Sequence, residues 1–312
     1  MKKAVVCGAS GAIGRALIAA LCARGVRVLA LSHRGSPRAG ALPPVAGVWH
    51  LPCALETLDE IQTHPEAPFD AFFHLAWAGT YGAARADATL QEQNILGAER
   101  AALLAARLGC GVFVGAGSQA EYGRLPLGAR AVETMPISPD TAYGKAKAAA
   151  AERTRALCRA NRMRHVWARV FSVYGEGDRA ETMIMSAIAA FTAGDDGAFT
   201  KGEQPWDYLY AADAAEALIA LAERGHDGKT YNVASGESRP LAEYITAIRD
   251  EIAPARRPRL GAIPYSEEGP VGLSADVSAL VSDTGFSPRI GFAEGIRRTA
   301  AWYKKAARRG EL

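Results

Sequence analysis

The sequence predicts an α/β protein built on a doubly wound parallel sheet, with a second, smaller C-terminal lobe. Short apolar runs alternate with helical patterns through the first half of the chain, as in successive βαβ units. The first run, residues 4–7, leads into a glycine-rich turn and then into a helical pattern. Such a run is typical of a strand that is buried on both faces of a parallel sheet.

The composition is that of an ordinary globular protein. Of the 312 residues, 49% are hydrophobic and 22% are charged, which excludes a disordered chain or a coiled coil. A net charge of +3 is too mild to indicate a nucleic-acid partner. The apolar run at the N-terminus breaks at Gly8, unlike a signal peptide, and no stretch of about 18 apolar residues suggests a membrane span. We therefore expect a cytoplasmic protein that binds neither nucleic acid nor membrane.

The cysteines argue against a metal site and against a disulfide framework. They are five in number, widely spaced, set in apolar surroundings and without a CxxC pair. We expect free, buried thiols in a reducing compartment and no bound metal.

The glycine-rich turn predicts a dinucleotide site. Residues 8–14 read Gly-Ala-Ser-Gly-Ala-Ile-Gly and lie between the first strand and the helical pattern of residues 15–24. Glycines permit a tight turn, and the N-terminus of the following helix offers unpaired N–H groups to a pyrophosphate, as in a Rossmann-type domain. The predicted cofactor contacts here are Gly8, Ser10, Gly11, Ala12, Ile13 and Gly14.

The end of the second strand, residues 26–31, favours NADP(H) over NAD. It is followed by Ser32-His33-Arg34 and has no carboxylate to hold a ribose 2′-hydroxyl. Arg34, with Ser32 and Arg15 nearby, suits a 2′-phosphate. NAD stays open as an alternative, because Arg34 could simply begin a solvated loop.

The next segments bring polar groups to the carboxyl edge of the sheet. We expect a strand at 45–51, a helix at 54–63 and a fourth strand at 70–77, whose Leu75 and Ala76 border the cofactor. His74 at this strand is expected to pack beside the cofactor loop and to take no part in the chemistry. A helix at 85–108 carries Asn94, whose amide can fix nearby backbone groups. A fifth strand, 111–118, ends in Ser118.

Tyr143 and Lys147 lie four residues apart in a helical pattern that spans residues 140–155. Residues at this spacing share one face of a helix, so both side chains can point into one site. A cation near a phenol lowers its pKa from about 10 toward neutrality, which gives a usable proton donor. Taken alone, the pair could equally be an exposed helix pair.

The C-terminal half predicts helices at 181–193, 211–224, 240–252, 276–284 and 293–308, and a strand at 230–234. Residues 183–185 are expected in the core, and Ser274 is the expected cap of the helix at 276–284. We assign residues 1–170 to the cofactor domain, to which residues 206–234 return, and residues 171–312 to the smaller lobe.

Together these motifs resemble an extended short-chain dehydrogenase/reductase of the nucleotide-sugar epimerase/dehydratase group. The resemblance covers nearly the whole chain in order. It rests on Gly8, Gly11 and Gly14, His74-Leu-Ala, Asn94 with Gly97, Ser118 with Tyr122-Gly123, Tyr143 with Lys147, residues 169–175, 206–213 and 231–233, and Gly295 with Trp302.

The resemblance implies a catalytic trio. Tyr143 would be the acid/base, Lys147 would tune it and hold the nicotinamide ribose, and Ser118 would hydrogen-bond the reacting sugar oxygen. A hydride transfer to a carbonyl needs such a proton donor and a second, oriented hydrogen bond. The resemblance also implies a nucleotide-diphosphate sugar as substrate, bound by Ser118, Gln119, Ser172 and Trp206, and a homodimer formed through helices near 85–108 and 141–160.

Departures from the family pattern narrow the reaction. Members that dehydrate a sugar carry an Asp-Glu pair directly after the position of Ser118, where this chain has Gln119 and Ala120, with Glu121 displaced by one residue. This argues against a 4,6-dehydratase. The NADP preference, and a likeness of residues 204–208 to nucleotide-4-keto-6-deoxysugar reductases, favour an NADPH-dependent 4-ketoreductase. A 4-epimerase and a non-catalytic NADP-binding sensor stay open as alternatives.

One further departure concerns arginines. Many relatives have an Arg that contacts the diphosphate at the position of Trp206. Arg169 is a poor substitute, because it lies within a strand and is expected to make a structural ion pair.

Overall fold

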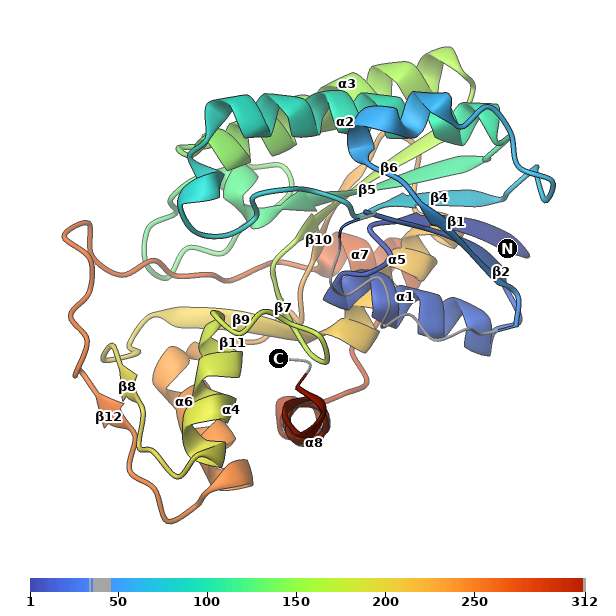
Figure 1. Ribbon diagram of the computed structural model, residues 1–312. Coiled ribbons are helices and arrows are strands. Elements are labelled where there is room, and N and C mark those ends of the chain that lie inside the picture. The colour runs from blue at the N-terminus through green and yellow to red at the C-terminus, as the bar shows by residue number, and fades with distance from the viewer. Residues whose placement is uncertain (34, 36–45, 311–312) are drawn as a thin grey trace.

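A seven-stranded parallel sheet forms the larger part of the molecule (Figure 1). The computed structural model describes residues 1–33, 35 and 46–310. The strand order is β10-β6-β5-β4-β1-β2-β3. The strands are β1 (Lys3–Cys7), β2 (Arg27–Ser32), β3 (Val48–Pro52), β4 (Ala71–His74), β5 (Val112–Ser118), β6 (Arg164–Val170) and β10 (Thr230–Val233). The predicted fold class is confirmed.

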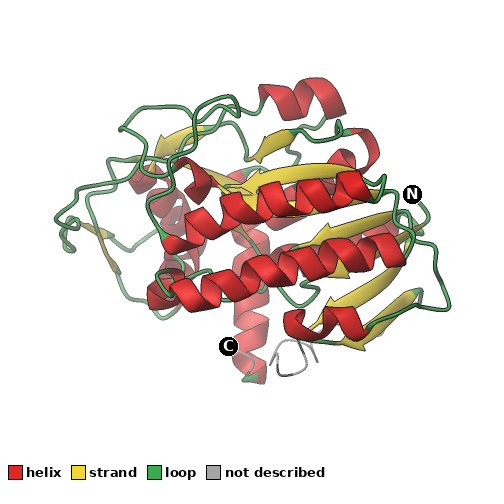
Figure 2. Ribbon diagram, turned by 90° about the horizontal axis from the view of Figure 1, so that it is seen from above, coloured by secondary structure: helices red, strands yellow, loops and turns green. Residues whose placement is uncertain are grey.

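Helices cover both faces of this sheet. On one face lie α2 (Ala88–Arg107), α3 (Ala142–Ala160) and the 3-10 helix η2 (Leu55–Glu60); on the other lie α1 (Ala12–Ala23), α5 (Ala211–Arg224) and α7 (Ser278–Thr284) (Figures 1 and 2). Successive strand residues alternate between the two cores: Phe72 and Phe113 pack toward α2, and Phe73 and Val114 toward α1 and α5. Because both faces are buried, the strands read as continuous apolar runs.

Smaller sheets and three helices make up the rest of the chain. One sheet has the order β11-β9-β7 and another pairs β12 with β8. The elements are β7 (Ser172–Tyr174), α4 (Met183–Thr192), β8 (Ala198–Phe199), β9 (Pro205–Tyr210), β11 (Ser238–Pro240), α6 (Leu241–Ile252), β12 (Arg259–Leu260) and α8 (Phe292–Arg309). Ile184 and Met185 are buried in their common core, and Met183 packs against it. The boundary at residue 170 stays a prediction.

Several predicted elements differ from the structure in their bounds: the helix at 15–24 starts at Ala12, and the strand at 70–77 spans only Ala71–His74. The segment at 54–63 forms only the short η2, and Arg107 of α2 donates to the carbonyls of Leu58 and Ile61 near its end. The helix that was expected to start at residue 85 starts at Ala88 and is capped by Asp87. The residues before it form a separate 3-10 turn, η3 (Gly82–Arg85).

The expected cap of α7 is wrong. The helix begins at Ser278, whose N–H donates to the carboxylate of Asp276 at 2.8 Å. The carbonyl of Ser274 instead accepts the N–H of Ala131.

The cysteines are free thiols, four of them buried and Cys22 partly exposed. In the part of the chain that the structure describes, no helix is both long and apolar enough to cross a membrane. Nor do its His, Cys, Asp and Glu side chains form a group of three suited to a metal ion.

Candidate active site

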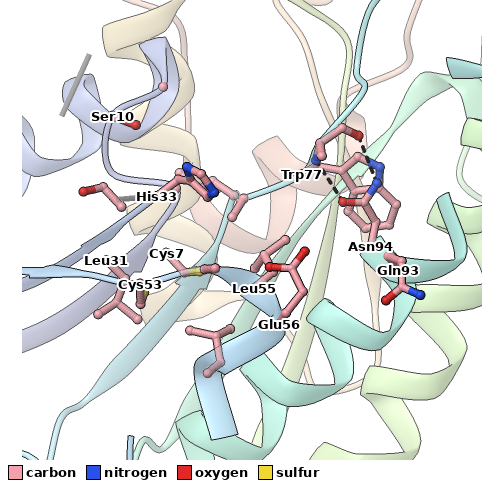
Figure 3. Close-up of a pocket in the computed structure, with 18 of the residues that line it drawn as sticks. Cys7, Ser10, Leu31, His33, Cys53, Leu55, Glu56, Trp77, Gln93 and Asn94 are labelled. Carbon is pink, nitrogen blue, oxygen red and sulfur yellow. Dashed lines mark hydrogen bonds between the residues drawn. The ribbon is translucent and has the colours of Figure 1, made fainter. Parts of the chain in front are cut away.

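A cavity of about 590 Å³ opens at the carboxyl ends of β1, β2, β3 and β4 (Figure 3). Its lining includes six of the predicted cofactor residues, namely Gly8, Ser10, Gly11, Ser32, Leu75 and Ala76. Ala12, Ile13 and Gly14 belong to the start of α1 and do not line it. Arg34 lies outside the described residues, so its role stays a prediction.

The glycine turn leaves room for a phosphate group at the start of α1. Gly8 has φ +96°, and a Cβ there would lie 2.6 Å from the backbone nitrogen of Ala76. A Cβ on Gly14 would collide with the carbonyl of Gly8. Gly11 precedes α1 and lines the cavity without a side chain. These residues fit the pyrophosphate of a dinucleotide, which a helix N-terminus favours.

Tight packing brings Ser118 and Tyr143 together. Ser118 ends β5, and Tyr143 lies in the first turn of α3, which Thr141 caps through the N–H of Gly144 at 3.1 Å. A Cβ on Gly144 would collide with the carbonyl of Ala120, so the glycine lets α3 approach the segment after Ser118. The hydroxyl of Ser118 accepts the N–H of Ala120 at 3.2 Å and lies near enough to Tyr143 to lower the pKa of its phenol.

A buried carboxylate fixes the backbone of Ser118. Glu121 accepts the N–H of Ser118 at 2.8 Å and the indole N–H of Trp167 at 2.9 Å through Oε1. Its Oε2 accepts the guanidinium of Arg169 at 2.7 Å. The predicted structural ion pair of Arg169 is therefore confirmed. Because all three donors bind Glu121, both of its carboxylate oxygens are already engaged in hydrogen bonds within the protein.

Lys147 lies beside Trp77 rather than against the phenol. Its Nζ donates to the carbonyl of Ala116 at 2.7 Å and lies 3.6 Å from the ring centroid of Trp77, but 5.8 Å from that of Tyr143. Burial lowers the pKa of Lys147 to about 7, and the charge of Glu121 opposes this shift.

The expected lowering of the Tyr143 pKa is wrong for this structure. Burial raises the pKa of Tyr143 above its usual value, and the opposing contributions are the hydrogen bond from Ser118 and the charge of Arg85. The reason is placement: Tyr143 is 8% exposed, and the ammonium expected to tune it is engaged elsewhere.

Two arginines lie near Tyr143, and the sequence prediction did not connect either of them with this side chain. The guanidinium carbon of Arg85 lies 4.5 Å from the Tyr143 ring centroid. Arg179 lines the cavity, and its charge also lowers the pKa of Tyr143. Both arginines lie far from Tyr143 in the sequence and belong to other segments, so no motif spacing connects them with it.

Trp77 lies between the cavity and two members of the predicted catalytic trio, Tyr143 and Lys147. It lines the cavity (Figure 3), and its indole N–H donates to Gln91 at 2.8 Å. Asn94 accepts the N–H of Ala78 at 2.8 Å and donates to its carbonyl at 2.9 Å, which confirms the expected role of this amide. His74 is buried and stacks on Phe113, and burial lowers its pKa to about 3. It packs as predicted and stays neutral.

The four residues predicted to contact substrate lie on four elements, with Ser118 at the end of β5. The indole N–H of Trp206 on β9 donates to the hydroxyl of Ser172 on β7 at 2.9 Å, so the structure brings these two together. Trp206 also packs beside the cluster that contains Tyr122. Gln119 begins the 3-10 helix η4 (Gln119–Tyr122) directly after Ser118. Their contact with a substrate stays a prediction.

A dinucleotide cradle beside a Ser-Tyr-Lys trio defines the class as a Rossmann-type protein of the short-chain dehydrogenase/reductase kind. More specifically, the chain belongs to the NAD dependent epimerase/dehydratase family, whose model matches residues 4–234.

The matching curated relatives include several dTDP-glucose 4,6-dehydratases. The dTDP-glucose 4,6-dehydratase of Xanthomonas campestris pv. campestris is 29% identical over 191 residues, which are 58% of this chain and 54% of the relative. The chain thus matches about half the length of this curated relative.

Solved structures share the fold over nearly the full length. The UDP-N-acetylglucosamine 4-epimerase of Methanobrevibacter ruminantium M1, in complex with UDP-N-acetylmuramic acid, has a TM-score of 0.86 and 22% identity, with 97% of this chain and 98% of that chain covered. RMD from Pseudomonas aeruginosa, complexed with NADPH, has a TM-score of 0.81 and 22% identity, with 98% and 99% covered.

Proposed function

We propose that this protein is an NADPH-dependent reductase of the 4-keto group of a nucleotide-linked 6-deoxysugar. The observation that carries the proposal is the placement of Tyr143 next to Ser118, which the close approach of Gly144 to Ala120 allows, beside a cavity whose glycine cradle fits a dinucleotide. When bound, the cofactor would supply the hydride. Family membership supports a nucleotide sugar as the substrate class.

In this proposal, the side chains of the site transfer the proton, hold the reacting oxygen and bind the cofactor. As the carbonyl oxygen gains negative charge, the hydroxyl of Tyr143 donates a proton to it, and the hydroxyl of Ser118 holds it by a hydrogen bond. Lys147, whose Nζ now donates to Ala116, would hold the nicotinamide ribose. Gly8, Gly11 and the start of α1 would hold the pyrophosphate.

The hydrogen bonds of Glu121 favour a reduction over a dehydration. Eliminating water needs a free carboxyl group as acid or base, whereas the carboxylate of Glu121 already accepts bonds from Ser118, Trp167 and Arg169. This argues against the activity of the dehydratase relatives. The second candidate is a 4-epimerase, favoured by the fold likeness to the epimerase of Methanobrevibacter ruminantium M1. We also propose a homodimer through α2 and α3, which lie side by side on one face of the sheet (Figure 2).

The test is NADPH oxidation with a panel of nucleotide 4-keto-6-deoxysugars, followed at the nicotinamide absorbance. Tyr143→Phe should lower the sugar-dependent rate by about 10²–10⁴-fold, the usual contribution of a general acid. Tyr303→Phe, on the distant α8, is the matched control and should leave the rate unchanged.

The other outcomes identify the alternatives. Inversion of a 4-hydroxy nucleotide sugar without net NADPH consumption would replace the reductase by an epimerase. NADPH binding with neither reaction would favour a non-catalytic sensor.

A further inference from the structure

We propose that Arg85 is a positioning residue for Tyr143: it supplies the fixed positive charge that stabilises the phenolate formed when Tyr143 gives up its proton. The sequence assigned this role to Lys147. The inference deepens the proposed function and rests on its assignment of Tyr143 as the acid/base.

Arg85 is held over the face of the phenol ring. It is the last residue of η3, and its guanidinium carbon lies 4.5 Å from the Tyr143 ring centroid. Its side chain is partly buried, and none of the carboxylates that the structure describes lies within ion-pair distance of it. A guanidinium in this position attracts the electron-rich face of the ring, and it attracts an ionised ring more strongly.

Lys147 is less suited to this task in the same structure. Its ammonium donates to the carbonyl of Ala116 and lies against Trp77, farther from the Tyr143 ring than Arg85 does. Burial lowers its pKa to about 7, so its charge changes in the pH range where the enzyme would work. An arginine stays charged throughout this range.

Other charged groups also face Tyr143 and must be weighed. Glu121 on η4 opposes ionisation, and Arg179 after β7 favours it, but less than Arg85 does. Glu121 cannot be changed without breaking its bonds to Ser118 and Arg169. With the residues that the structure describes, Arg85 makes no such bonds, so its charge can be removed while the hydrogen bonds of Glu121 are kept.

The proton balance of the step is simple. The O–H bond of Tyr143 breaks, its proton forms a bond to the alkoxide oxygen of the reduced sugar, and the electron pair stays on the phenolate. The charge moves from the sugar oxygen to the phenol, directly beneath the guanidinium of Arg85. Because opposite charges attract more strongly at shorter distance, the nearby guanidinium lowers the energy that is needed to form the phenolate.

The experiment titrates Tyr143 in the full-length protein without substrate, by carbon NMR of ring-labelled tyrosine, with the signal assigned through Tyr143→Phe. Arg85→Met should raise the pKa of Tyr143 by about one unit, which corresponds to about 1.4 kcal/mol of difference between the interactions of Arg85 with the phenolate and with the phenol. Arg85→Lys should restore most of the shift. Arg153→Met removes an equal charge about 15 Å farther along α3 and should change nothing.

Two results would overturn the inference: an unchanged pKa in Arg85→Met, or a pKa in Arg85→Lys as high as in Arg85→Met. If Arg85→Met does not fold, Arg85→Gln replaces it. Because the titration needs no turnover, it stands apart from the proposed reaction. In an active enzyme, the pH profile of kcat should move with the same variants, whereas a merely structural role would lower kcat equally at every pH.

Discussion

The two sides of Tyr143 are built in different ways. On the Ser118 side, a buried carboxylate, an indole, a guanidinium and a backbone N–H form a bonded network beneath the sheet edge. On the Arg85 side, a short 3-10 turn places one partly buried cation against the ring. The comparison teaches that many buried contacts hold the backbone of Ser118 in place, whereas a single contact places the positive charge of Arg85 against Tyr143. Variants on the two sides should therefore differ in what they damage.

Glu121→Ala should have the largest effect on stability. It leaves the buried guanidinium of Arg169 without its partner, and breaking a buried ion pair typically destabilises a protein by about 3–5 kcal/mol. Denaturant unfolding measures the loss. Glu237→Ala, which breaks an exposed pair with Arg239, is the control and should change stability by less than about 1 kcal/mol. A variant as stable as the wild type would show that the Ser118 side does not depend on this network.

The difference in the free energy of unfolding between the wild type and Lys147→Met should depend on pH, because burial disfavours the charged ammonium of Lys147. The folded pKa of Lys147 is about 7 and its ordinary value is 10.5, so between these pH values the unfolded chain binds the extra proton. Wild-type stability should then rise with pH by about 1.4 kcal/mol per unit relative to Lys147→Met, and the difference should level off below pH 7. Unfolding curves at several pH values measure this. A difference that is independent of pH would contradict the lowered pKa.

Gly144→Ala tests how closely α3 must approach Ser118. Alanine normally favours a helix over glycine by about 1 kcal/mol, but here its Cβ would meet the carbonyl of Ala120. We expect a net loss of about 1–3 kcal/mol, typical of overpacking, and a lower kcat because Tyr143 moves away from Ser118. Gly291→Ala is the control, since a Cβ there meets only open space. Equal stability of both variants would rule out the tight contact.

Sequence patterns predicted the structure correctly where the position of a residue depends on a single helix or strand. The helix at residues 211–224 was predicted to its ends, because its apolar spacing is continuous. The places of Ser118 at a strand end and of Tyr143 in the first turn of a helix were likewise predicted, whereas the catalytic roles that the resemblance implies for them stay a prediction. The position of the Lys147 ammonium could not be predicted, because it depends on Trp77 and on the carbonyl of Ala116, which other segments bring close.

The same limit explains why Arg85 was missed. Its contact with Tyr143 joins residues 58 positions apart, through a turn that the sequence pattern merged into the following helix. The charge on Glu121 was visible in the sequence, but its commitment to Arg169 and Trp167 appears only when β5 and β6 pair.

Arg85→Met should have the smallest effect on folding, which sharpens the contrast between the two sides. A partly exposed cation–π contact contributes about 0.5–1 kcal/mol, so the free energy of unfolding should fall by less than about 1 kcal/mol. Denaturant unfolding measures it beside Glu121→Ala. A small loss here, combined with a raised Tyr143 pKa, would mean that the cation acts on the chemistry of the ring and hardly on the fold. A loss as large as that of Glu121→Ala would instead make Arg85 part of the frame, and the distinction between a side that fixes geometry and a side that supplies charge would be lost.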